Sequence, residues 1–466
     1  MEVALLRSTG RTAEARNRLA ERLREDPTSA MLRNEGILLG ASGTSAAAGE
    51  SLWRHLAADP ERVIEVAADY MEIGMYADAL ALLSRHYPAV DAQETEPGAV
   101  LPQDYPLVAY YRGYCREKLG QSGRPDFDMA ARQSTRYVFP NRAGSLPVLR
   151  RAIASNPSDA TAHALLGSLW MSGGMVDRAL AEWELARRLN PHMPALHRNI
   201  ARTLLDVKHD EAGALEVYRE GLGQDPENME LYTGMNVVLS LLRHPASERA
   251  DTLLRYPDRD GLTTPMRFDL ALSLAEAGRI AEAEQTFQGR FFAREEGGVN
   301  VRRVWVEVEL RKALALARAG RKQEALGVAG ALGKEAPGLA FTREGMEAFQ
   351  RGARYEYLLG KVEAASGDAA SARGHWESAA AGSGPYGLLA SRELGRADWS
   401  SRAEQQVAGS GDGAARNGDV LARGLLLRAL GREGEALAAF REVLLKPDRD
   451  LSYYVARAAM LEPESK

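Results

Sequence analysis

The sequence predicts an all-α fold, an α-solenoid in which roughly ten to twelve antiparallel helix pairs lie side by side. The first observation behind it is that small and apolar residues recur three or four positions apart, in short segments that end at Pro or Gly. The second is the spacing of Pro157, Pro191 and Pro226, which are 34 (191 − 157) and 35 (226 − 191) positions apart. Consecutive units of nearly equal size indicate an array of stacked repeats.

The clearest unit runs from Ala160 to Pro191 and reads as two helices joined by a turn. Gly167 and Trp170 fall on one face of the first helix, and Ala179, Trp183 and Ala186 fall on one face of the second. Gly167 and Ala179 leave room for two helix backbones to approach, and Trp183 is expected to fill the space beside them. Pro191 ends the second helix, because proline disfavours the α conformation of the residue before it.

This pattern resembles the tetratricopeptide (TPR) repeat, whose unit is a pair of helices. The resemblance implies a TPR-like superhelix with a concave face. It also implies a non-enzymatic scaffold that binds a protein or peptide in that groove.

The chain divides by pattern into three parts. Residues 1–104 read as degenerate TPR-like helix pairs, residues 105–335 as the central array, and residues 336–466 as further repeats that contain a Gly/Ser-rich linker at 381–418. The first unit has little more than Met1 to Ser8 for its first helix, so we expect an uncapped start. The apolar residues at this end are Val3, Leu5, Leu6 and Leu19, and we expect an upstream domain, a partner or a second copy of the chain to cover them.

Composition argues against several classes of protein. The net charge of −5 is not the basic balance typical of nucleic-acid binders, so no nucleic-acid partner is expected. No apolar run approaches the length of a membrane span, and no secretory signal is recognisable at the N-terminus. The single cysteine, Cys115, cannot form an intrachain disulfide and suits a reducing compartment. We therefore expect a cytoplasmic protein without a membrane partner.

Signatures of chemistry are weak throughout. The chain has no P-loop and no HExxH motif, and the glycines at Gly409, Gly411 and Gly413 follow no strand. Cys115 lies among aromatic residues on an expected helix and reads as a core thiol rather than a nucleophile. We therefore predict no catalytic residue, no cofactor and no metal site, and hence no enzyme.

Candidate groove residues lie on the first helix of the unit after Pro191. Some TPR arrays grip a terminal carboxylate with Lys, Arg and Asn at fixed positions, and here only Asn199 occupies its expected place. Arg198 and Arg202 are candidates for contacting an anionic ligand, with a salt-bridged helix surface as the alternative. The carboxylate-clamp function is therefore not carried over.

A second resemblance covers about Tyr105 to Gly330, through the segments YPLVAYYRGYCREKLG, RYVFPNR, RYPDRDGL and GRFFAREEGG. It is to the TPR array of bacterial proteins that carry an N-terminal sugar-mutarotase-like β-sandwich domain, which this chain lacks. It implies one alternative to the scaffold, an accessory subunit of a carbohydrate-acting assembly that docks on a β-sandwich at its N-terminal end. A ligand-sensing regulator is a further alternative, independent of this resemblance. Two loops either contact that partner or only shape the solenoid. Their candidate residues are Phe139, Asn141 and Arg142 in one, and Arg290, Glu295 and Glu296 in the other.

Overall fold

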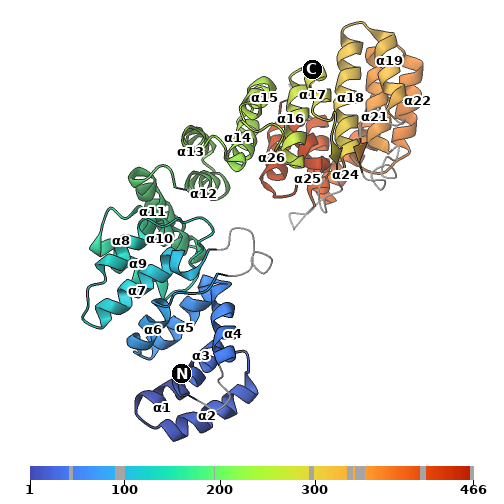
Figure 1. Cartoon of the computed structure of the whole chain (residues 1–466). Helices are drawn as coiled ribbons and strands as arrows, with labels where there is room; N and C mark the ends of the chain where they lie inside the picture. The colour runs from blue at the N-terminus through green and yellow to red at the C-terminus, as the bar shows by residue number, and fades with distance from the viewer. Residues whose placement is uncertain are drawn as a thin grey trace. The chain divides into compact units, whose positions relative to one another are not determined.

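The computed structural model describes residues 1–40, 46–89, 100–193, 195–292, 299–332, 340–341, 352–409 and 416–461. Across these residues 26 α-helices follow one another, and the predicted all-α fold is confirmed (Figure 1). The only strands among them are β1 (Phe291–Phe292) and β2 (Ala340–Phe341), which pair in parallel with Phe291 opposite Ala340. The chain divides into two compact units, Met1–Thr203 and Leu204–Lys466.

The first unit contains twelve α-helices and one short 3₁₀ turn in its described residues. Their bounds are α1 Glu2–Ser8, α2 Thr12–Glu25, α3 Ala30–Leu38, α4 Ala46–Ala57, α5 Pro60–Glu72, α6 Tyr76–Leu83, η1 Pro102–Asp104, α7 Pro106–Lys118, α8 Arg124–Ala130, α9 Ser145–Ser155, α10 Ala160–Ser172, α11 Val176–Leu189 and α12 Leu196–Thr203.

The second unit begins with one π-helical turn and continues with fourteen α-helices in its described residues. Their bounds are η2 Leu204–Lys208, α13 Glu211–Gln224, α14 Met229–Leu241, α15 Ala246–Leu254, α16 Thr264–Glu276, α17 Ile280–Gln285, α18 Val301–Arg318, α19 Lys322–Ala331, α21 Ala353–Ala365, α22 Ala369–Ala380, α23 Pro385–Glu393, α24 Trp399–Gly409, α25 Asn417–Ala429, α26 Glu433–Leu445 and α27 Leu451–Ala459.

Helix pairs stack in the manner of a solenoid within each unit. In the first unit the first helix of a pair contacts the first helix of the next, as α5 contacts α7 and α7 contacts α9. The second unit repeats this with α16, α18, α21, α23 and α25. Each pair therefore buries one face against its neighbour, which is how a repeat array builds a continuous core.

A glycine and an aromatic ring lock the two helices of a pair together. A Cβ atom on Gly167 would lie only 2.4 Å from Cδ1 of Trp183, so no larger residue fits there without a shift. The Trp183 Nε1 atom donates a hydrogen bond to the Ala164 carbonyl at 3.1 Å. This close approach in the strongest repeat is the one that the sequence predicted.

The same lock recurs in the second unit. Gly360 faces Trp376 and Gly424 faces Phe440. The separation along the chain is 16 positions each time (183 − 167, 376 − 360, 440 − 424). One packing solution is therefore reused at a constant offset.

The N-terminal helices cover more apolar surface than the sequence indicated. Val3 and Leu19 are buried in a small cluster with Ala15 and Leu39, and Leu6 packs against that cluster. Leu5 is 44% exposed. The expectation of an apolar face that needs an outside cover is therefore wrong for Val3 and Leu19, because α1, α2 and the end of α3 bury them against one another.

The Gly/Ser-rich segment 381–418, predicted to be a linker, is largely helical in its described residues, and 410–415 lie outside them. Helices α23 and α24 occupy most of it, and Leu388 and Ala403 are buried together with Leu426. A Cβ atom on Gly387 would meet the Gly382 carbonyl oxygen at 2.3 Å, so this glycine serves close packing rather than flexibility. The linker prediction rested on Gly and Ser content, which does not show which glycines serve close packing.

The last helices of the second unit return to its earlier ones. Helix α27 contacts α16, and α26 contacts α14, in addition to their neighbours in the stack. A stack in which each pair touched only the adjacent pairs would lack these contacts. The second unit is therefore closed on itself by its C-terminal helices.

Candidate functional site

The candidate groove residues lie together on α12 of the first unit. Arg198 donates from Nε to the Asn199 Oδ1 atom at 3.3 Å and from Nη2 to the same atom at 3.2 Å. Arg202 is exposed, one turn further along. The structure thus brings two of these side chains into contact and places the third at the surface.

The loop after α8 presents aromatic side chains. Phe139 is 65% exposed, while its neighbour Val138 is buried and anchors the loop. Asn141 is exposed, and the Arg142 guanidinium lies 3.5 Å from Oε2 of Glu65 and 3.9 Å from Oε2 of Glu61. The predicted loop therefore offers an aromatic tip, whereas its arginine is held against α5.

The second predicted loop is described only up to Phe292. Glu295 and Glu296 lie outside the described residues. Arg290 is described, and it lines a pocket of about 390 Å³ that the sequence did not reveal as a whole. The other lining residues are Leu262, Thr264, Arg267, Gly289, Phe291 and Phe292.

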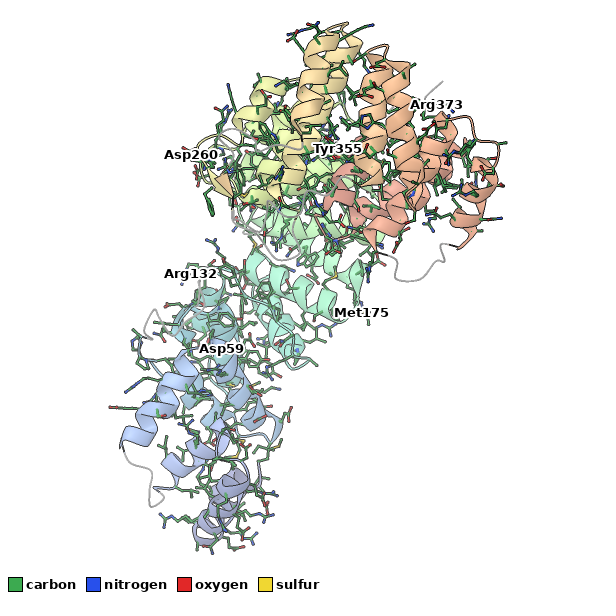
Figure 2. All side chains as sticks on the ribbon, turned by 90° about the vertical axis from the view of Figure 1, so that its right-hand side faces the viewer. Asp59, Arg132, Met175, Asp260, Tyr355 and Arg373 are labelled. Carbon is green, nitrogen blue, oxygen red and sulfur yellow. The ribbon has the colours of Figure 1, made fainter. Side chains whose placement is uncertain are left out.

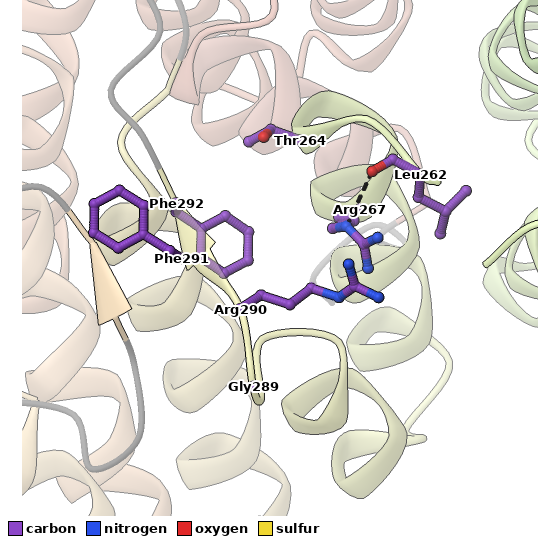
Figure 3. A pocket seen from close by; sticks show the side chains of 7 residues that line it. All are labelled: Leu262, Thr264, Arg267, Gly289, Arg290, Phe291 and Phe292. Carbon is purple, nitrogen blue, oxygen red and sulfur yellow. Dashed lines mark hydrogen bonds between the residues drawn. The ribbon is translucent and has the colours of Figure 1, made fainter. Parts of the chain in front are cut away.

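Two arginines dominate the pocket. Figure 3 shows the guanidinium groups of Arg267 and Arg290 lying next to one another. Arg290 is paired with the Asp260 carboxylate and donates from Nη1 to the Asp260 carbonyl at 3.1 Å. Burial, followed by the positive charge of Arg290, lowers the pKa of Arg267. The exposed carboxylates of Asp260 and Asp258 act in the opposite direction and offset the positive charge of this region.

Apolar side chains form the other side of the pocket. Phe292 is buried and stacks on Phe268 with ring centroids 5.9 Å apart. Its neighbour Phe291 is 66% exposed. A ligand with a negative group next to an apolar one would match both sides.

Sequence reasoning found Arg290 and missed Arg267. An arginine three positions into a helix reads as part of a solvated face, yet Arg267 is only 8% exposed. The sequence shows Arg267 near a helix start at Pro265 and a Phe291–Phe292 pair downstream, but no spacing pattern connects the two. Their proximity is tertiary and could not be deduced from spacing.

Residues with reactive side chains elsewhere are held in packing roles. Cys115 is buried, and burial raises the pKa of its thiol to about 12. The His163 ring bonds the Glu182 carboxylate at 2.6 Å and the Pro157 carbonyl at 3.1 Å. Across the described parts of the chain no three metal-ligating side chains converge, and no helix is long and apolar enough to span a bilayer.

Comparison with known proteins identifies the repeat. Residues 141–194 match the family model of the tetratricopeptide repeat. No curated protein sequence matches the chain. The likeness to bacterial proteins with a sugar-mutarotase-like β-sandwich therefore stays a prediction.

Solved structures similar to this chain share little sequence with it. A tetratricopeptide repeat protein from Parabacteroides merdae is 13% identical, with a TM-score of 0.26, over 69% of this chain and 92% of that one. Yeast Tom70 is 12% identical, with a TM-score of 0.30, over 97% and 95%. MamA is 16% identical, with a TM-score of 0.19, over 48% and 94%. With such low TM-scores, these structures carry no argument about function.

Proposed function

We propose that this chain, a protein that carries tetratricopeptide repeats over residues 141–194, is a non-enzymatic cytoplasmic scaffold that binds a protein or peptide along the first helices of its repeats. The observation that carries the proposal is the lock between Gly167 and Trp183, together with its recurrence at Gly360 and Gly424. Such locks hold the two helices of a pair in fixed positions. Binding then costs little ordering entropy on the scaffold's side.

The exposed Arg202 and the half-buried Arg198 and Asn199 of α12 supply the polar contacts in this proposal. Arg198, Asn199 and Arg202 lie on a first helix and carry donors suited to carboxylates or backbone carbonyls. The aromatic tip at Phe139 adds an apolar contact within the same unit. Mixed polar and aromatic surface is typical of protein interfaces.

Affinity capture with the full-length chain tests the proposal. Proteins that co-purify are identified by mass spectrometry for the wild type, for Arg202→Glu, and for Arg219→Glu as a control on the second helix α13. We expect a defined partner that Arg202→Glu loses and Arg219→Glu retains. Equal capture by all three, or none by the wild type, would contradict the proposal. A captured β-sandwich protein would favour the accessory role instead.

A further inference from the structure

The pocket beside Arg290 gathers three sources of positive potential. The first is the N-terminus of α16, a helix of 13 residues that begins at Thr264 with no side-chain cap and with a proline in its first turn. Helix N-termini carry unsatisfied N–H groups and attract anions. The second and third are the guanidinium groups of Arg267 and Arg290.

Arg267 is built into the wall rather than carried on the surface. Its Nε atom donates to the Leu262 carbonyl at 3.1 Å, and its Nη2 atom donates to the carbonyls of Arg259 at 3.1 Å and Asp260 at 2.7 Å. Its Nη1 atom has no acceptor among the residues that the structure describes. These bonds fix the guanidinium, so its remaining donors are already oriented for a ligand.

The negative charge that neutralises Arg290 is weakly held. The carboxylate paired with Arg290 belongs to Asp260, whose side chain is 95% exposed. Figure 2 shows Asp260 at the outer edge of the second unit. Exposed ion pairs contribute between nothing and about 1 kcal/mol, so a better-placed oxyanion would displace this one.

We propose that the pocket lined by Arg267, Arg290 and Phe291 binds the carboxylate of an acidic, apolar peptide segment, and that Asp260 competes with it for Arg290. The inference rests on the proposed function, since it supplies the chemical class of one partner segment. Guanidinium groups recognise carboxylate and phosphate alike. The lining residues Leu262 and Phe292 favour a peptide, because an apolar side chain that follows the carboxylate would contact them.

Fluorescence polarisation tests this site with two labelled octapeptides, one of alternating Glu and Leu and the other of alternating Gln and Leu. We expect the full-length chain to bind the Glu peptide at least about fivefold more tightly than the Gln peptide, as charge-assisted bonds require. Arg290→Gln should remove that preference. Asp260→Asn should strengthen binding of the Glu peptide about threefold, because it removes the competing carboxylate.

Arg279→Gln is the matched control. Arg279 pairs with Asp251 and Glu282 on the same unit and does not line the pocket. It should bind both peptides as the wild type does. Arg267→Lys keeps the positive charge but loses the planar guanidinium group that the backbone carbonyls hold in place. It should weaken binding of the Glu peptide without abolishing it.

Three results would overturn the inference: equal affinity for the Glu and Gln peptides, an Arg290→Gln variant that keeps the preference, or an Asp260→Asn variant that binds no better. Inorganic phosphate serves as a competitor in the same assay. If phosphate binds in an Arg290-dependent way and the Glu peptide does not, the site takes a phosphoryl group and the carboxylate assignment is wrong. If the peptide assay fails while affinity capture still finds a partner that Arg202→Glu loses, this inference is wrong and the scaffold proposal stands.

Discussion

Arg457 on α27 donates from Nη1 to the Oδ1 atom of Asp269 on α16 at 2.6 Å, across 188 positions of sequence. Both side chains are almost completely buried. Glu276, two turns further along α16, accepts from Arg249 at 2.7 Å and from Arg457 at 3.4 Å. Burial opposes ionisation of Glu276, but the surrounding arginines lower its pKa to about 2. The closure of the second unit therefore depends on a buried charge network.

Replacing Arg457 with Met should destabilise the second unit by about 3–5 kcal/mol, because it leaves Asp269 buried without its partner. Chemical denaturation followed by circular dichroism measures the loss. Arg373→Met is the matched control, since Arg373 pairs with Glu377 at an exposed position and should cost less than about 1 kcal/mol. If both variants lose a similar free energy of unfolding, the buried pair contributes no more to stability than the exposed one.

The lock in the strongest repeat gives a coupled prediction. Trp183→Ala should cost about 3–5 kcal/mol through the lost ring. Gly167→Ala should cost roughly 1–3 kcal/mol through overpacking against that ring. The double variant should be more stable than the sum of the two losses implies, because the ring that the new methyl group would strike is absent. Strict additivity in a double-mutant cycle would refute the contact.

Gly173→Ala is the control for this cycle. The Cβ atom would lie 3.6 Å from the Trp170 carbonyl oxygen, an ordinary contact, and Gly173 has a negative φ of −86°. Its free energy of unfolding should stay within about 0.5 kcal/mol of the wild type.

Glu309 gives the second unit a pH dependence. Burial, followed by the neighbouring Glu284, raises the pKa of Glu309 to about 7, although Lys312 lies 3.8 Å from its Oε2 atom. The folded state then holds a proton that the unfolded state releases, so stability falls as pH rises from about 4.5 through 7. Glu309→Gln should flatten this dependence and stabilise the protein at pH near 8 by roughly 1–3 kcal/mol, since one pKa unit corresponds to about 1.4 kcal/mol. Urea titrations at several pH values measure this dependence. If the free energy of unfolding changes with pH in the same way in the wild type and in Glu309→Gln, the raised pKa of Glu309 is contradicted.

The helical character of residues 385–393 is testable by limited proteolysis. A linker would be cut there, whereas α23 with its buried Leu388 and Ala390 should resist cleavage. Gly387→Ala should also destabilise, because the new methyl group would strike the Gly382 carbonyl. Early cleavage within this segment of the intact protein would restore the linker interpretation.

The sequence predicted what local spacing determines. The lock between Gly167 and Trp183 follows from one repeat unit, because both residues belong to the same helix pair. The contact between Arg457 and Asp269 could not be predicted, since a repeat pattern describes adjacent units and says nothing of distant ones. The pocket was half predicted: Arg290 stands out in its loop, whereas Arg267 acquires its role only when α16 folds beside that loop.

The central claim is that a partner lies along the first helices of the repeats. Hydrogen exchange with mass spectrometry on the full-length chain, with and without its captured partner, tests this claim most directly. We expect added protection on α10 and α12, while α11 and α13 exchange as they do in the free protein. Protection confined to α11 and α13, or none on any helix, would contradict it.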